Sequence, residues 1–281
     1  MKIMIQTAIL AGLTFGVQAL SLAEEGTARV KFAGCSISAG AYMKDMAKSF
    51  EEKTGIPVEV KGGGVPMGIA GTLSGNVDLG GSCRHLLKKE EEQGAVGTVV
   101  GYDMLMFIVH PDNLADSLTL EQVRSVFSGK ISNWKELGGL DQPIILVGRE
   151  AEDAGVAVMF REMVMKDLPL SDKRLDLLSS SEIEKEVEAN RYGIGVTGIS
   201  ALLRKVKVLK VDGVAPTRDN FRNGTYPLVR PFYLMTKGAP QGLARQFIDF
   251  VLSPEGQLVM AKNAVPMDDY LYRTTGDNKK T

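Results

Sequence analysis

The stretch from Val58 to Arg84 reads VEVKGGGVPMGIAGTLSGNVDLGGSCR, and it decides the fold. Its first residues alternate between apolar and polar side chains, which is typical of a β-strand. Three glycines follow at 62–64, and apolar residues then recur at near-helical spacing at Met67, Ile69, Ala70 and Leu73. Glycines let the backbone approach a ligand, and a helix N-terminus carries partial positive charge. Strand, glycine loop and helix in this order therefore predict a site for an anion.

Polar and small residues gather at the ends of three predicted strands. They are Cys35 and Ser36 after a strand at 30–33, Gly64 and Val65 after the strand at 58–60, and Asp78, Ser82, Cys83 and Arg84 around a strand at 77–80. Strands that alternate with helices form a parallel sheet with right-handed crossovers. Ligands of such sheets bind beyond the carboxyl ends of the strands, so these residues are expected to converge.

Apolar patterns predict further elements along the chain. Strands are expected at 105–109, 144–147, 192–197 and 227–236, and helices from 119 onwards, at 156–165 and at 243–252. A helix after position 38 is expected to carry Tyr42, Met46 and Phe50 on one face. Another helix is expected to begin at Ser181, because Ser181-Glu182-Ile183-Glu184 has the S-x-x-E form of a capping box.

Composition limits the classes of partner. The chain has 281 residues, enough for one large or two modest domains, and an apolar fraction of 44% that supports packed cores. With 33 basic and 34 acidic residues the formal net charge is −1. This balance gives no support to nucleic-acid binding or to a polybasic membrane surface.

The first 23 residues have the features of a secretory signal peptide. Lys2 precedes a mostly apolar run, and Ser21-Leu22-Ala23 supplies the small residues before a cleavage site at Glu24. An uncleaved membrane anchor is the alternative, although the run is barely long enough to span a bilayer. We expect a mature protein that is exported to the periplasm.

Several stretches resemble the phosphate-binding proteins of high-affinity phosphate ABC transporters. The similarity starts at 34–84 and includes NLADSLTLEQ at 113–122, FSGKISNW at 127–134, VGRE at 147–150, VDGVAPT at 211–217, YPLVRP at 226–231 and IDFVLSPEG at 248–256. The resemblance implies an α/β fold of the type II periplasmic binding proteins, with a ligand cleft between two lobes. It places lobe one at 26–108 plus 227–281, lobe two at 109–226, and hinges near Val109 and Pro227.

The resemblance also implies a set of ligand-binding residues. They are Cys35, Ser36, Gly64, Val65, Asp78, Ser82, Cys83, Arg84, Arg149 and Asp153. The ligand is expected between Asp78 and Arg149, with a carboxylate at the position of Asp78 accepting the proton of hydrogen phosphate. Asp153 has a second interpretation as a helix N-cap.

The chain departs from the family pattern at this site. Val65 and Cys83 stand where serines are usual, and Arg149 is followed by EAEDAG at 150–155 instead of a Ser-Gly-Thr loop. Missing hydroxyls remove hydrogen bonds, and the acidic side chains would repel an anion. We therefore hypothesise that the chain binds phosphate more weakly than the resemblance implies, or prefers another ligand.

The two cysteines leave three alternatives open. An even number of cysteines in an oxidising compartment favours a disulfide between Cys35 and Cys83. Two small buried thiols are the second alternative. The third is a thiophilic ligand site, with Met67 and His85 as further ligands, for Cu(I) or arsenite.

Three functional classes follow from these observations. The first is the solute-binding subunit of an ABC importer for phosphate or a related oxyanion, acting with an ABC permease. The second is a binding module that presents a non-phosphate ligand to a membrane sensor. The third is an enzyme, but the chain has no paired base and nucleophile, no H-E-x-x-H and no phosphate-loop lysine motif. We expect a monomeric binding protein with no cofactor and no resident metal, not an enzyme.

Overall fold

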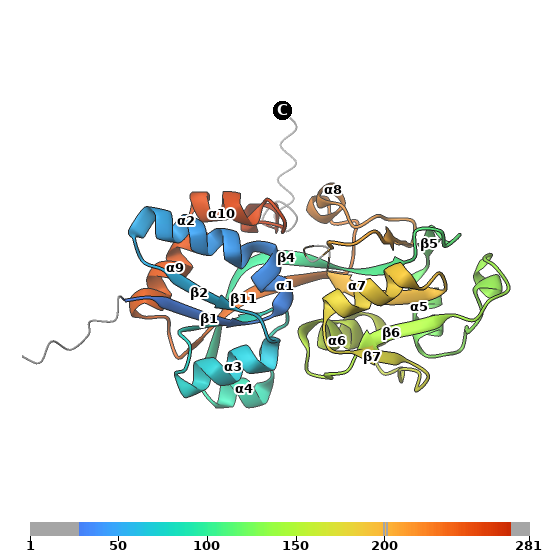
Figure 1. Cartoon of the computed structure of the whole chain (residues 1–281), viewed down its shortest axis with the longest axis horizontal. Coiled ribbons are helices and arrows are strands. Elements are labelled where there is room, and N and C mark those ends of the chain that lie inside the picture. Colours follow the sequence, from blue (N-terminus) through green and yellow to red (C-terminus); the bar gives the residue numbers. More distant parts are fainter. Residues whose placement is uncertain (1–27, 199, 201, 271–281) are drawn as a thin grey trace, which may run out of the picture.

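Two α/β lobes lie side by side along the long axis of the molecule, in a computed structural model that describes residues 28–198, 200 and 202–270 (Figure 1). The expected fold class is thereby confirmed. The proposed signal peptide at 1–23 and its cleavage site at Glu24 lie outside the described residues. Among the residues that are described, no helix has both the length and the apolar character needed to cross a membrane.

Lobe one is built on the predicted β-α-β-α-β unit, whose strands pair in parallel in the order β2-β1-β3. Its elements are β1 (Val30–Gly34), α1 (Ser36–Ser38), the π-helix η1 (Ala39–Met43), α2 (Lys44–Thr54), β2 (Val58–Lys61), α3 (Val65–Ser74), β3 (Leu79–Ser82), α4 (Lys88–Glu92), α9 (Gly242–Leu252) and α10 (Pro254–Met260). The first three helical pieces follow one another without a break. They bury Tyr42, Met46 and Phe50, as the apolar spacing predicted.

The buried face of α3 differs from the predicted stripe. Val65, Gly68, Ile69 and Thr72 face the protein interior, whereas Met67 and Ala70 are exposed. A Cβ on Gly68 would overlap the backbone of β1 at Ala33 and Gly34. The missing side chain thus lets α3 lie directly on β1, which brings the N-terminus of α3 close to the end of that strand.

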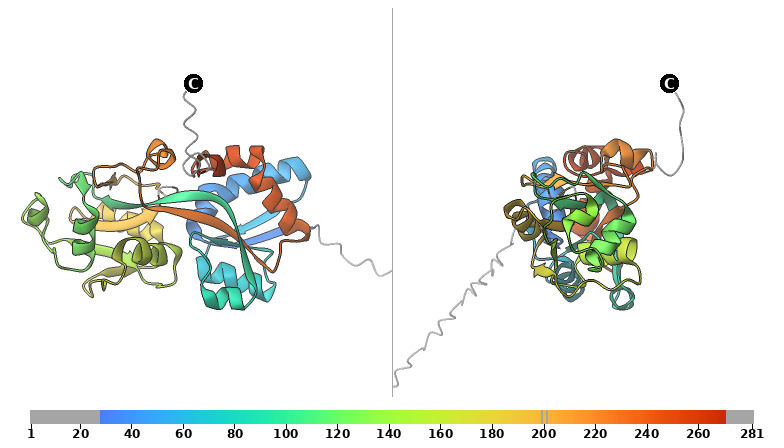
Figure 2. Two further views of the ribbon diagram at one scale, coloured as in Figure 1. Left: turned by 180° about the vertical axis from the view of Figure 1, so that it is seen from behind. Right: turned by 90° about the vertical axis from the view of Figure 1, so that its right-hand side faces the viewer.

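Two strands at the centre of the molecule connect the lobes, β4 (Ala95–Val109) and β11 (Val229–Lys237). Figure 2 shows β4, and the segment that leads into β11, passing from one lobe to the other. β4 pairs with β11 up to Met104 and with β8 (Gly193–Gly198) from Leu105 onwards. This change of partner lies four residues before the predicted crossing at Val109. On the return path, the Leu105 N–H donates to the Leu228 carbonyl at 2.8 Å, beside the predicted crossing at Pro227.

Lobe two continues the sheet in the order β8-β6-β7, with β9 beside β4. Its other elements are β5 (Ser117–Leu118), α5 (Leu120–Phe127), the 3-10 helix η2 (Trp134–Leu137), β6 (Ile145–Arg149), α6 (Gly155–Phe160), the π-helix η3 (Arg161–Met165), β7 (Leu175–Leu177), α7 (Ser180–Ala189), β9 (Lys207–Val208), β10 (Lys210–Val211) and α8 (Arg218–Arg222). β6 is parallel to both of its neighbours, so its carboxyl end at Arg149 is a candidate ligand-binding edge.

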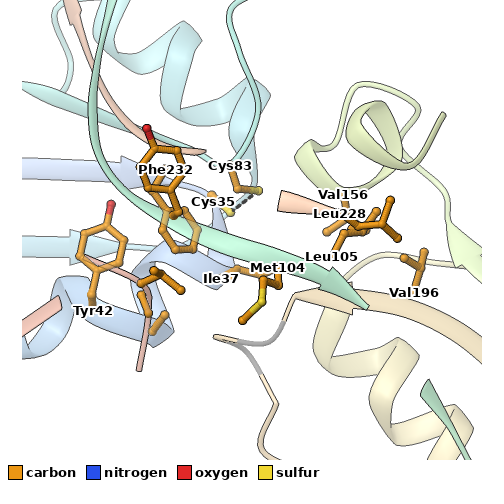
Figure 3. Close-up of a cluster of buried hydrophobic side chains, with 14 of the residues drawn as sticks. Cys35, Ile37, Tyr42, Cys83, Met104, Leu105, Val156, Val196, Leu228 and Phe232 are labelled. Atoms are coloured by element: carbon orange, nitrogen blue, oxygen red, sulfur yellow. Dashed lines mark hydrogen bonds between the residues drawn. The ribbon is translucent and has the colours of Figure 1, made fainter. Parts of the chain in front are cut away.

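The hydrophobic core continues through the crossing between the lobes. Met104, Leu105, Val156, Val196 and Leu228 are buried in one cluster (Figure 3). Close-packed apolar side chains exclude water and resist local rearrangement. The crossing is therefore a firmly packed connection between the lobes.

Candidate functional site

The lobe-one wall of the candidate site begins where β1 ends. Gly34 has a φ of +150°, and a Cβ there would overlap the backbone of Gly81, so only glycine lets β1 and β3 end this close together. The Cys35 N–H donates to the Gly81 carbonyl at 2.9 Å, and α1 begins at Ser36. This geometry places Cys35 beside Cys83, the residue that directly follows β3.

The glycine loop brings the N-terminus of α3 into the same wall. Gly64, with a φ of +95°, is the N-cap residue of α3, and its N–H donates to the Gly34 carbonyl at 3.0 Å. The amide of Gly64 therefore holds the loop on β1 and is not available to a ligand. Within the described chain, no side chain caps α3, so the donors that remain in its first turn are the N–H groups of Val65 and Met67, since Pro66 has none.

The lobe-two wall begins where β6 ends at Arg149. α6 starts at Gly155, and a Cβ on this residue would overlap the Cys83 Sγ, so the start of α6 directly contacts lobe one. The N-cap residue of α6 is Ala154, and no side-chain hydrogen bond caps this helix in the described structure. The prediction that Asp153 is the N-cap is therefore wrong, because the helix begins one residue later.

A second lobe-two helix, α7, brings hydroxyl groups to the site. The Ser179 Oγ accepts a hydrogen bond from the Glu182 N–H at 3.2 Å, and α7 begins at Ser180. The S-x-x-E pair that acts is thus Ser179 with Glu182, not the predicted Ser181 with Glu184. The helix therefore begins earlier than predicted, with Ser179 as its N-cap residue and Ser180 as its first residue.

The starts of α1, α3, α6 and α7 surround one small cavity between the lobes. Its volume is about 30 Å³, and it is lined by Cys35, Ser36, Ile37, Gly64, Val65, Cys83, Arg149, Ala154, Gly155, Val156, Ser179 and Ser180. N–H groups in the first turn of a helix have no partner within the helix, and the helix dipole makes this end partly positive. A small anion in the cavity would therefore face several backbone donors from both lobes.

Arg149 supplies a full positive charge to the cavity. Burial lowers the pKa of its guanidinium, while the nearby thiols of Cys35 and Cys83 act in the opposite direction. Among the described residues, its buried Nη1 has no hydrogen-bond partner. A buried donor without an acceptor is costly, especially on a charged group. An anionic oxygen in the cavity would remove this cost.

A second arginine lies behind the two thiols. Arg230 is fully buried and donates to Asp103 Oδ2 through Nε at 3.0 Å and Nη2 at 2.5 Å. Asp103 also accepts from the Ser200 hydroxyl at 2.8 Å. Arg230 still interacts electrostatically with Cys35 and Cys83. It therefore favours the thiolate of Cys35 without lining the cavity, while Asp103 offsets part of its charge.

The two cysteines form a free dithiol in the cavity wall. Their Sγ atoms lie 2.9 Å apart and both are buried (Figure 3). The hydrogen bond between the sulfurs lowers the pKa of Cys35 to about 6, although burial opposes this, and Arg230 adds to the lowering. The same bond, together with burial, raises the pKa of Cys83. The pair therefore favours ionisation of Cys35 over ionisation of Cys83.

The structure brings some of the predicted site residues together and separates others. Those that line the cavity are Cys35, Ser36, Gly64, Val65, Cys83 and Arg149, and those that do not are Asp78, Ser82, Arg84 and Asp153. That the lining residues bind a ligand stays a prediction.

Asp78 lies at the opposite end of β3 from the cavity. β3 begins at Leu79, so Asp78 precedes the strand instead of following it. Its carboxylate is exposed and accepts the Lys31 N–H at 2.7 Å. Asp78 therefore lies away from the cavity that Arg149 lines, and a ligand in this cavity would not contact it.

The other three residues are engaged within the protein. The Ser82 hydroxyl donates to the Arg84 carbonyl at 2.7 Å. The Arg84 guanidinium donates to both carboxylate oxygens of Glu90, at 2.8 and 2.7 Å. Asp153 takes part through its backbone carbonyl, which accepts from the Arg84 Nε at 3.1 Å. These contacts shape the loops that flank the cavity but leave the side chains outside it.

Sequence reasoning did not place several lining residues in the site. These are Ile37, Ala154, Gly155, Val156, Ser179 and Ser180. The serines could have been found from the S-x-x-E spacing of Ser179 and Glu182, which marks the start of α7. Ile37 and Val156 carry no such signal, because an apolar residue at a helix start is equally typical of a core.

Comparison with known proteins gives consistent matches over most of the chain. Residues 22–255 match the family model described as PBP superfamily domain. The phosphate-binding protein PstS of Bacillus subtilis is 28% identical over 263 residues, covering 92% of this chain and 87% of that protein.

Solved structures agree with this result. A Clostridium perfringens protein, described as a phosphate ABC transporter substrate-binding protein and solved with bound phosphate, is 33% identical, with a TM-score of 0.79 over 85% of this chain and 98% of the other. An ABC-type phosphate transport receptor from Vibrio cholerae is 26% identical, with a TM-score of 0.69 over 85% of this chain and 100% of the other.

Proposed function

Because this chain belongs to the PBP superfamily, a family of solute-binding proteins and not of enzymes, we propose that it is the solute-binding subunit of an ABC importer and that its ligand is phosphate. The observation that carries the proposal is the convergence of four helix N-termini on a cavity that holds the unpartnered Nη1 of Arg149. Backbone donors around a small cavity that Arg149 also lines are suited to a small oxyanion.

The departures from the family pattern weigh less against phosphate than the sequence implied. Glu150 and Glu152 are exposed, and neither of them lines the cavity. Ser179 and Ser180 place hydroxyl-bearing residues at the lobe-two wall, where Ala154 and Gly155 have none. These positions remove much of the reason to expect weak binding.

The proposal includes a partner and a location. Relatives described as phosphate transport proteins support delivery of phosphate to an ABC permease in the membrane. A soluble delivery protein would act as a monomer in the periplasm, after removal of residues 1–23. Intact-mass measurement of the protein from its native host should give an N-terminus at Glu24, and retention of residues 1–23 would contradict the proposed export.

A thermal-shift experiment on the chain 24–281 tests the ligand. The ligands compared are phosphate, arsenate, molybdate and sulfate, each at the same ionic strength. A ligand present at 100 times its Kd stabilises the native state by about 2.7 kcal/mol, which corresponds to roughly 5–10 °C for a protein of this size. Phosphate should produce such a shift, and a shift with sulfate alone would overturn the assignment of phosphate.

A further inference from the structure

The dithiol of Cys35 and Cys83 is not explained by phosphate binding. Both residues line the cavity, and their side chains are only 4% and 1% exposed. β1 and β3 pair in register at Gly34 and Gly81, so the backbone fixes the two thiols as neighbours. A pair held in this way is preorganised to bind one ligand through two adjacent sulfurs.

The electrostatic surroundings make the pair nucleophilic. Arg149 and Arg230 both interact with the sulfurs, and positive charge favours the thiolate over the thiol. The thiolate is the form of cysteine that attacks an electrophile or binds a soft ligand. The lowered pKa of Cys35, about 6, means that this form is present at neutral pH.

The surroundings do not complete a site for a transition metal. Met67 is 45% exposed on α3 and does not line the cavity. His85 points away, with its Nε2 3.4 Å from Glu162 Oε1 in lobe two. Across the described residues, no group of three or more His, Cys, Asp or Glu side chains could hold a metal ion. The expected ligand set therefore reduces to the two sulfurs.

A ligand for this cavity must accept two adjacent sulfur bonds and also match the polar lobe-two wall. Linear two-coordinate Cu(I) places its sulfurs on opposite sides of the metal, which does not fit sulfurs that lie 2.9 Å apart. A pyramidal trivalent centre binds two sulfurs side by side. If it also carries a hydroxyl, that group can meet the donors of Arg149 and Ser180.

We propose that the Cys35–Cys83 dithiol binds a trivalent arsenic or antimony oxyacid, such as arsenite, in the same cavity. Each sulfur displaces one hydroxyl of the oxyacid. One departing hydroxyl takes the proton of the Cys83 thiol, and the other takes a proton from solvent, equal to the one that Cys35 releases when it ionises, so two water molecules leave. Two sulfur–arsenic bonds replace two oxygen–arsenic bonds. Arsenic stays trivalent throughout, so the step requires neither an oxidant nor a reductant.

This inference rests on the proposed function only for the position of the cavity, and a combined titration separates the two. The chain 24–281 is reduced, freed of reductant without air, and titrated with arsenite by calorimetry and native mass spectrometry. We expect one adduct per chain, with the mass of the oxyacid minus two waters, and the loss of two titratable thiols. Arsenite should also compete with phosphate.

Matched variants locate the sulfurs. Cys35→Ser and Cys83→Ser should each weaken arsenite binding about 100-fold or more, because the second bond of a chelate forms at a high effective concentration. Met67→Leu removes a nearby sulfur outside the cavity and should leave binding unchanged. If either serine variant does not fold, the corresponding alanine variant replaces it. Arg149→Gln should weaken phosphate binding at least about tenfold and should weaken the binding of arsenite less, because arsenite is neutral.

Three results would overturn the inference. The first is a reduced protein that has both thiols titratable and does not bind arsenite. The second is arsenite binding that persists in both cysteine variants. The third is a Cys35–Cys83 disulfide that resists reductant in the folded protein. If phosphate binds but arsenite does not, the inference fails and the proposed function stands. If arsenite binds but phosphate does not, the reverse holds.

Discussion

The Arg84 Nε in lobe one donates a hydrogen bond to the Asp153 carbonyl in lobe two, at 3.1 Å. The remaining nitrogens of the same guanidinium hold the buried carboxylate of Glu90, whose side chain is 8% exposed. One side chain thus fixes the loop after β3 and touches the loop before α6. Both loops flank the cavity. Arg84 therefore stabilises lobe one through Glu90 and also bonds the two lobes to each other beside the cavity.

Replacement of Arg84 should destabilise the protein strongly. Arg84→Ala leaves Glu90 as a buried charge without its partner, which costs about 3–5 kcal/mol. Urea unfolding of the two proteins measures the difference. The exposed pair Lys88–Glu92, with side chains 89% and 65% exposed, provides the control. Lys88→Ala should cost less than about 1 kcal/mol, and equal losses in the two variants would contradict the role of Arg84.

A methyl group at Gly155 should prevent full closure of the lobes. Its Cβ would overlap the Cys83 Sγ of lobe one, so the start of α6 could no longer reach the cavity. Gly155→Ala should weaken phosphate binding at least about tenfold, a loss of about 1.4 kcal/mol, while the melting temperature without ligand changes little. Isothermal titration calorimetry measures the loss of phosphate binding, and small-angle scattering with saturating phosphate measures whether the lobes still close.

Gly40→Ala is the matched control for Gly155→Ala, because no atom lies within 4 Å of its added Cβ. It should bind phosphate like the unmodified chain and reach the same radius of gyration. If Gly155→Ala also closes fully, the α6 contact with Cys83 does not define the closed state.

The pKa of Cys35 predicts an unusual pH profile for thiol reactivity. The ionised form predominates above a pKa of about 6, so alkylation of Cys35 by iodoacetamide should rise through pH 6 and level off by pH 7. Phosphate should slow the reaction, since the cavity is then filled. Peptide mass mapping of the product identifies the modified cysteine. An inflection near the ordinary thiol value of about 8.5 would show that the hydrogen bond from Cys83 and the charge of Arg230 do not stabilise the thiolate.

Local sequence patterns could predict the lobe-one half of the site. The lobe-one strands are short and parallel, so their carboxyl ends must meet at one edge of the sheet. The patterns that indicate them are the alternation at Val58 to Val60, the glycines at 62–64, and Gly80 with Gly81. Asp78 shows the limit of such reasoning. β3 has only four residues, so a boundary error of two positions moves a residue from one edge of the sheet to the other.

The lobe-two half depended on tertiary structure. Ser179 and Ser180 come from a helix that is far from Cys35 in sequence, and only the folding of the crossing strands brings them to one cavity. The sequence also could not show whether Cys35 and Cys83 are free thiols or form a disulfide. An even number of cysteines allows a disulfide, whereas the position of both sulfurs in the cavity wall follows from the register of β1 with β3.

The most direct test of this account is isothermal titration of the chain 24–281 with phosphate at neutral pH, with Arg149→Gln beside it. We predict a Kd of about 1 μM or tighter, equivalent to about −8.2 kcal/mol. Arg149→Gln should weaken binding by at least about tenfold, because a hydrogen bond to a charged group contributes about 1.5–3 kcal/mol. Lys135→Gln, an exposed cation in lobe two, controls for net charge. A folded chain that gives no heat with phosphate, or an Arg149→Gln variant that binds as tightly as the parent, would contradict the central claim.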